Sequence, residues 1–263
     1  MSTEFVYQQS EILIVLALAG LLALSGELGY RLGRRPRKVP TVREETQFTS
    51  IEVALLALLS LLLGFTFAMA LSRFELRKEM VVRESNAIGT AALRSQFLPA
   101  SHHDEVSQLF RRYVAIRLDA VLRTRQFSPA RRELDAETKR LQTRLWKIAA
   151  TAAAGDPRSV PLGLFTHAVN ELIDIKATRD VAVANHVPES VLLMLFGFAV
   201  LAAGILGYGN ALAGARIRIP AAIYSVVVVL VILLIIDLDR PQEGLARVSQ
   251  ESMIQLQMIL NSR

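Results

Sequence analysis

Four long apolar stretches constrain what this chain can fold into. They cover residues 12–30, 53–72, 190–212 and 219–236. Each is close to the roughly 20 residues that an α-helix needs to cross a hydrocarbon layer of about 30 Å. They give the chain a hydrophobic content of 52%, while the 21% of charged residues gather between them. The sequence therefore predicts an all-α integral membrane protein with four transmembrane helices.

The first stretch has a second interpretation, a cleaved secretory signal peptide. Residues 1–11 contain no Lys or Arg, so the basic segment that precedes the apolar core of a signal peptide is missing. Glu27 interrupts the stretch and has to lie near a membrane interface or inside the helix bundle. We expect this stretch to be a membrane span.

The segment between the second and third spans has the pattern of helices in water. Apolar residues recur at helical spacing over 105–125 and 130–154, and a further helix is expected over 166–185. Nothing after Arg73 stops the second membrane helix, so it should continue beyond the membrane. The predicted divisions are a transmembrane hairpin at 1–74, a soluble helical segment at 75–188, a second hairpin at 189–240 and a C-terminal tail at 241–263.

The third stretch carries small residues at every fourth position. Such a stripe lets the backbone of another membrane helix approach closely. Its members are Ala199, Ala203, Gly207 and Ala211.

Charge and cysteine content narrow the possible partners. The net charge is +6, and basic residues beside membrane spans interact with anionic lipid headgroups, so we expect membrane lipid rather than nucleic acid as the partner. The chain has no cysteine, which excludes disulfides and thiolate metal sites. Eight Lys or Arg residues flank the spans on each side of the membrane, so charge counting leaves the orientation open.

No pattern of catalytic residues is present. The run from His102 to Glu105 has ligand-type side chains, but neighbouring helical residues diverge by about 100° and metal pairs on a helix usually sit four apart. The acidic residues of this run fit the first turn of a helix. Asn170, Glu171 and Asp174 share a helical face with Thr178, and this face is a polar site, a solvated surface or a contact with another helix. We predict no metal, no cofactor and no enzymatic activity.

The second span carries a distinctive face. Helical spacing places five side chains on one narrow stripe of this span. Along the chain they change from small to bulky and then to small and polar. For a lone helix, a lipid-facing or bundle-facing stripe is the alternative interpretation. The stripe consists of Ala57, Leu61, Phe65, Ala68 and Ser72.

This span also contains a recognisable motif. A serine is followed by an aliphatic residue, next comes a glycine followed by an aromatic residue, and nine residues after that glycine comes an arginine followed by an aromatic residue. These are Ser60, Leu61, Gly64, Phe65, Arg73 and Phe74. The pattern resembles the second membrane helix of the bestrophins, a family of ligand-gated ion channels. The whole chain is similar to a bacterial bestrophin-like membrane protein family, on the segments 63–74, 84–90, 112–114, 170–174, 185–188 and 237–241.

The resemblance implies a homopentamer with a central pore lined by the second helix. Carried over by position, Ala57, Leu61 and Phe65 would form its hydrophobic neck. The resemblance further implies the bacterial inner membrane as location, with both termini and the soluble segment in the cytoplasm. The calcium-binding acidic cluster of animal bestrophins has no clear counterpart, since Asp237, Asp239 and Glu243 supply too few carboxylates.

Physical reasoning permits such a pore. A ring of Leu61 and Phe65 around a shared axis would form an apolar constriction that gates by dewetting. Arg73, Arg77 and Lys78 just beyond it would favour anions, although Glu75 and Glu79 oppose them. The hypothesis is thus a homo-oligomeric channel for small ions. The alternative is a non-conducting membrane scaffold or sensor whose helical segment binds a partner.

Overall fold

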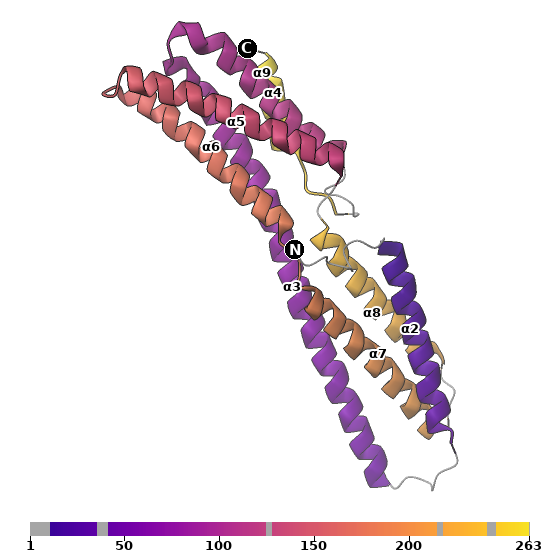
Figure 1. Cartoon of the computed structure of the whole chain (residues 1–263). Helices are drawn as coiled ribbons and strands as arrows, with labels where there is room; N and C mark the ends of the chain where they lie inside the picture. Colours follow the sequence, from indigo (N-terminus) through magenta and orange to yellow (C-terminus); the bar gives the residue numbers. More distant parts are fainter. Residues whose placement is uncertain (1–10, 36–41, 125–127, 215–217, 241–245, 263) are drawn as a thin grey trace. The chain divides into compact units, whose positions relative to one another are not determined.

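A computed structural model of the 263-residue chain describes residues 11–35, 42–124, 128–214, 218–240 and 246–262 (Figure 1). These residues form helices and connecting segments, and no strand occurs among them. The chain divides into two compact units, the first comprising residues 1–72 and 186–239 and the second comprising residues 73–185 and 240–263. The helices are α2 (Glu11–Gly33), α3 (Val42–Arg94), α4 (His103–Leu122), α5 (Pro129–Gly155), α6 (Val160–Ala184), α7 (Glu189–Leu212), α8 (Arg218–Asp239) and α9 (Glu251–Asn261), with two short 3₁₀ turns at Ser95–Phe97 and Ala100–His102.

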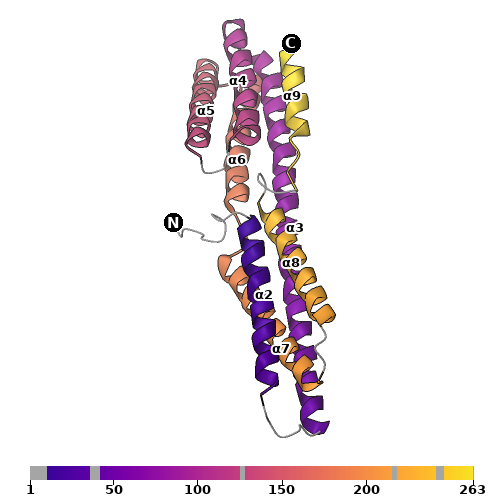
Figure 2. The ribbon, with the colours of Figure 1, turned by 90° about the vertical axis from the view of Figure 1, so that its right-hand side faces the viewer.

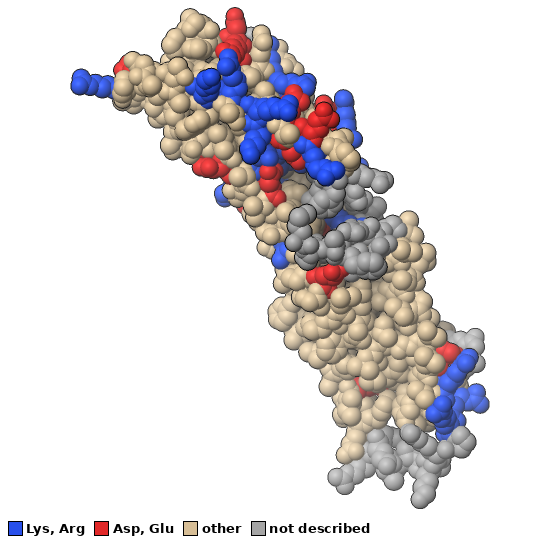
Figure 3. All heavy atoms as spheres, viewed as in Figure 1, with Lys and Arg blue, Asp and Glu red and all other residues tan. Residues whose placement is uncertain are grey.

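The four predicted spans are confirmed. Four helical segments are long and apolar enough to cross a membrane, and they lie in α2, α3, α7 and α8. The helix α3 runs without interruption for 53 residues, so the second span does continue beyond its apolar part. In the space-filling view, α2, α7 and α8 are covered mainly by uncharged side chains, whereas charged side chains gather over α4 and α5 (Figure 3).

The first unit depends on a very close approach of α2 to α7. A Cβ atom added to Gly29 would lie 1.9 Å from the carbonyl oxygen of Gly204, and one added to Gly207 would lie 2.0 Å from that of Gly26. The hydroxyl of Ser25 on α2 donates a hydrogen bond to the Val200 carbonyl at 2.7 Å. Ala203 and Gly207 of the predicted small-residue stripe lie next to Gly26 at this contact, and Ala199 is buried one turn earlier on α7. The stripe therefore acts as predicted.

The second unit is a helical bundle with its own core. The helix α5 packs against α4 and α6, and α9 packs against α4 (Figure 2). Phe110, Tyr113, Phe165 and Leu172 are among its fully buried side chains. Both α5 and α6 begin with a serine cap followed by proline near the first turn, which suits a helix start because proline has no N–H to leave unpaired.

The C-terminal segment contains a helix that packs within the second unit. Residues Glu251–Asn261 form the helix α9, which buries Met253, Leu256 and Leu260 in the core of the second unit. The sequence shows these apolar residues at helical spacing, but the segment is short. Its placement in the bundle core comes from contacts with α4, a helix that is distant from it in the sequence.

Candidate functional site

The membrane-spanning part of α3 has one buried stripe. Leu59, Leu63, Thr66 and Ala70 face the rest of the chain and are almost fully covered. Their spacing of three and four residues is that of a single helical face. This stripe fixes which side of α3 packs within one chain.

The predicted pore face lies on the opposite side of α3. Each of its members from Leu61 onward comes two residues after a member of the buried stripe, and two residues correspond to about 200° around a helix. Leu61 is 53% exposed and Phe65 is 65% exposed, and the small side chains on this face are also exposed. The exposed small members are Ala57, Ala68 and Ser72.

This exposed face differs from the described exposed faces of the other spans because it carries aromatic and hydroxyl side chains. The exposed large residues of α2 and α8 are aliphatic, as expected for side chains in contact with lipid. Small side chains are exposed on α2 as well, but the exposed face of α3 also carries the Phe65 ring and the hydroxyls of Ser60 and Ser72. A Cβ added to Gly64 on this face would have no atom of the chain within 4 Å. The α3 face can therefore contact another protein surface or border a water-filled space.

The three basic residues that follow the span have different surroundings. Arg77 is only 2% exposed, and its guanidinium donates to the carbonyls of Ala182 at 3.1 Å and Asn185 at 2.5 Å. These carbonyls belong to the C-terminal end of α6, so the cation also satisfies backbone acceptors there. A buried Arg77 does not fit the predicted position beside a pore.

Arg73 is half-buried, whereas Lys78 lies at the surface 3.8 Å from the Glu75 carboxylate. One turn further along α3, Arg83 pairs with Glu79 at 2.6 Å. The carboxylates of this exposed stretch are thus balanced by neighbouring cations.

A buried charge cluster lies in the second unit. The Glu84 side chain is fully buried, and Arg117 donates to it from Nε at 2.7 Å and from Nη2 at 3.1 Å. Arg179 donates to the same carboxylate and also to the Gln250 side chain at 3.0 Å. Burial would raise the pKa of Glu84, but the two guanidiniums outweigh burial and hold the pKa at about 2.

This cluster joins four parts of the chain. Glu84 comes from α3, Arg117 from α4, Arg179 from α6 and Gln250 from the segment before α9. The Gln142 amide of α5 donates to the Tyr113 hydroxyl at 3.2 Å beside them. Sequence reasoning missed the cluster, although Glu84 and Tyr113 stood within the segments that carried the family resemblance. The resemblance marked them without showing that they meet.

The other segments of the resemblance occupy well-defined positions. The Asp239 carboxylate accepts from the Val187 N–H at 2.7 Å and lies 3.5 Å from the His186 ring, so it fixes the backbone just before α7. Asp237 is buried, and Glu243 lies outside the described residues. No three His, Asp or Glu side chains come together to hold a metal ion within the described ranges.

The polar residues of α6 border a hollow at the surface of the second unit. Asn170 donates to Asp174 at 3.0 Å, and both line a cavity of about 590 Å³ together with Asn86 and Thr90 of α3. His167 and Glu171 also line it. The side chains of two family-like segments therefore share one solvated surface. By contrast, Trp146 is partly exposed on α5, outside the core.

Comparisons with known proteins agree with these features. A family model described as a Bestrophin-like domain matches residues 19–253. A point mutant of a bacterial bestrophin homologue from Klebsiella pneumoniae has a TM-score of 0.69 and 17% identity, covering 97% of this chain and 98% of that chain. A zinc-phased structure of the same homologue has a TM-score of 0.67 and 17% identity, covering 96% and 98%. No curated protein matches the sequence.

Proposed function

The chain belongs to the bestrophin-like family, and from this membership we propose that it forms a homo-oligomeric ion channel whose pore is lined by α3. The observation that carries the proposal is the position of Leu61 and Phe65. They are exposed in a single chain, and they lie opposite the stripe that packs within the chain. A shared symmetry axis next to this face would convert it into a pore lining.

The neck of the proposed pore is apolar. Rings of Leu61 and Phe65 would exclude water when narrow and pass ions when wide. Ala57, Ala68 and Ser72 would widen the path on either side of these rings because their side chains are small. A pentamer is the subunit number that the resemblance to bestrophins implies. The location we propose is the bacterial inner membrane, with the second unit in the cytoplasm.

Ion selectivity is the finer part of the proposal. The expected anion preference relied on Arg73, Arg77 and Lys78, but Arg77 is buried and Lys78 has Glu75 beside it. Glu79 and Arg83 form a further balanced pair. We therefore propose that this stretch gives at most a small preference for anions, and we expect a reversal potential close to zero under a potassium chloride gradient.

Conductance of purified protein in liposomes tests the proposal. The parent should pass ions, and L61A and F65A should raise the flux because each removes part of the apolar neck. The matched control is L230A, since Leu230 carries the same side chain as Leu61 and is 56% exposed, but it lies on α8 rather than on the proposed pore helix. This control should leave the flux unchanged.

The oligomer mass in detergent separates the two hypotheses. A monomer, or a folded oligomer that is electrically silent in the parent and in both neck variants, would favour the scaffold or sensor. Because the chain has no cysteine, L61C can also be labelled with a charged thiol reagent without other reactive sites. Loss of current on labelling L61C, and not on labelling L230C, is the result expected for a pore-lining residue.

A further inference from the structure

The first unit contains a cavity between α2, α7 and α8. Its volume is about 540 Å³, within the range of small-molecule binding sites. The cavity exists because its walls carry few large side chains: Ala23 and Gly26 on α2 face Ala203 and Gly207 on α7 and the alanine pair at 221–222 on α8. All of these residues belong to membrane-spanning helices.

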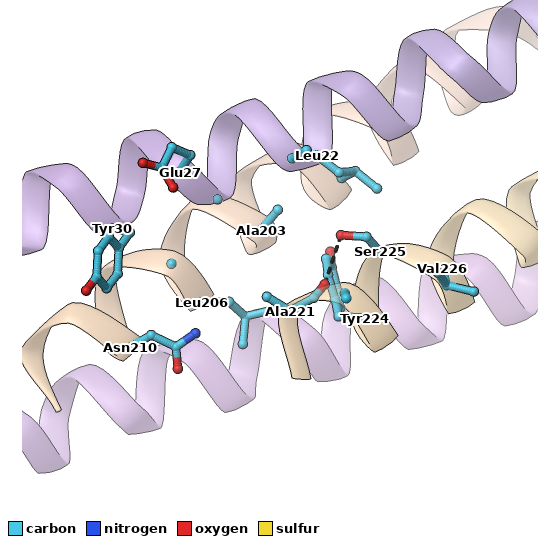
Figure 4. A pocket seen from close by; sticks show the side chains of 14 residues that line it. Leu22, Glu27, Tyr30, Ala203, Leu206, Asn210, Ala221, Tyr224, Ser225 and Val226 are labelled. Atoms are coloured by element: carbon cyan, nitrogen blue, oxygen red, sulfur yellow. Dashed lines mark hydrogen bonds between the residues drawn. The ribbon is translucent and has the colours of Figure 1, made fainter. Parts of the chain in front are cut away.

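One part of the cavity is apolar. Leu22, Leu206 and Val226 supply aliphatic surface there (Figure 4). The hydroxyl groups nearby are already used, since Tyr224 donates to the Ala199 carbonyl and Ser225 to the Ala221 carbonyl, both at 2.9 Å. A water molecule needs two to four polar partners, so the apolar part does not suit water. Within a bilayer, a hydrocarbon chain does suit it.

The other end is polar and leads toward basic residues. Glu27, Tyr30 and Asn210 lie at this end (Figure 4). The Arg31 Nε donates to the Glu27 carboxylate at 2.9 Å, and the Arg34 guanidinium lies 6.0 Å from the centre of the Tyr30 ring. Arg31, Arg34 and Arg35 are exposed at the end of α2, where a membrane helix reaches the headgroup layer. Exposed guanidiniums at that depth attract phosphate groups.

We propose that this cavity binds a membrane phospholipid with an anionic headgroup. One acyl chain lies between α2, α7 and α8, and the phosphate lies against the arginines that follow Glu27. The small residues that admit the acyl chain are distinct from the α3 face, so the site is independent of the proposed pore. An anionic lipid is favoured over a zwitterionic one because Arg31 and Arg34 contact the lining residues Glu27 and Tyr30, and both guanidiniums are exposed where a phosphate can reach them.

Filling the cavity tests the acyl-chain part. The experiment measures phospholipid retained per chain by native mass spectrometry, after incubation with phosphatidylglycerol or with phosphatidylcholine of the same acyl chains. The parent should retain phosphatidylglycerol several-fold better. A222F should retain several-fold less of both lipids, because its ring fills the cavity from an exposed position. The control I223F adds the same ring at the adjacent residue, which does not line the cavity, and should behave as the parent.

Removing the basic mouth tests the headgroup part. The double variant R31Q/R34Q should lose the preference for phosphatidylglycerol while still retaining phosphatidylcholine as the parent does. R123Q/R144Q removes the same charge from exposed residues of the second unit and should change neither. Equal retention by A222F and I223F would overturn the proposal. The proposal would also be overturned if the A222F oligomer dissociated while its lipid retention stayed unchanged. That result would mean that a second copy of the chain, and not a lipid, covers the cavity.

Discussion

The buried carboxylate of Glu84 gives the most quantitative prediction. The change E84Q keeps the size of the side chain and removes its charge. It leaves Arg117 and Arg179, both almost fully buried, without the anion that they share. Breaking a buried ion pair in this way typically costs about 3–5 kcal/mol, because a charge remains in a poorly solvated place.

The pKa of Glu84 gives a second estimate of this cost. A pKa of about 2, against an ordinary value of 4.5, corresponds to about 3 kcal/mol of stabilisation by the folded second unit. The two estimates agree. With about 3–5 °C lost per kcal/mol for a unit of this size, E84Q should lower the melting temperature of the second unit by about 9–25 °C.

Tryptophan fluorescence is the assay. Trp146 is the only tryptophan, and it lies on α5 in the second unit, so thermal unfolding followed by fluorescence reports on that unit. The control E137Q breaks the exposed pair between Arg112 and Glu137, and its effect should stay below about 1 kcal/mol. If E84Q melts within about 2 °C of the parent, the cluster does not stabilise the fold as described.

The dependence on pH has a defined sign. Because the folded pKa of Glu84 lies below its ordinary value, its stabilising contribution is complete above about pH 4.5 and is lost as the pH falls toward 2. The difference in melting temperature between the parent and E84Q should therefore be constant from pH 7 to pH 5 and shrink below pH 4.5. A difference that grows on acidification would contradict this assignment.

Three further changes have expected outcomes. G29A should destabilise the first unit in detergent by several kcal/mol, because the new Cβ would lie 1.9 Å from the Gly204 carbonyl oxygen. The control G20A on the same helix adds a Cβ in open space, so its thermal unfolding should show a neutral or slightly stabilising effect. R77Q should destabilise the second unit by about 2–4 kcal/mol, since two carbonyls at the end of α6 lose a charged donor, and thermal unfolding measures this loss. The control K78Q should change the stability by less than about 1 kcal/mol. S128A should cost about 1 kcal/mol in the same fluorescence assay, because the Ser128 hydroxyl caps α5 by accepting from the Arg131 N–H at 3.2 Å.

Much of the fold could be predicted from local pattern. The apolar stretches identified the four spans because a bilayer requires a minimum length of uncharged helix. The missing stop signal after Arg73 predicted that α3 continues beyond its apolar part, and the small residues near Gly207 predicted a close helix contact. These properties depend on residues within a few turns of each other.

The candidate site was predicted only in part. The spacing of Leu61 and Phe65 placed them on one face, but the sequence could not show that this face stays uncovered within one chain. Arg77 shows the limit clearly, because it was grouped with Lys78 from adjacency in the sequence. A rotation of about 100° per residue turns Arg77 into the bundle and Lys78 toward solvent.

The sequence by itself determined that the chain crosses a membrane as helices, since an apolar stretch must satisfy its own backbone hydrogen bonds wherever water is absent. Only the tertiary structure decided that Glu84, Arg117, Arg179 and Gln250 meet, because they are separated by up to 166 residues and no local spacing encodes their contact. The same holds for the cavity beside Gly26, since a hollow depends on how three helices pack. A membrane span can be predicted because it depends only on the solvent around a single helix. A charge cluster or a cavity cannot, because it depends on how several helices pack together.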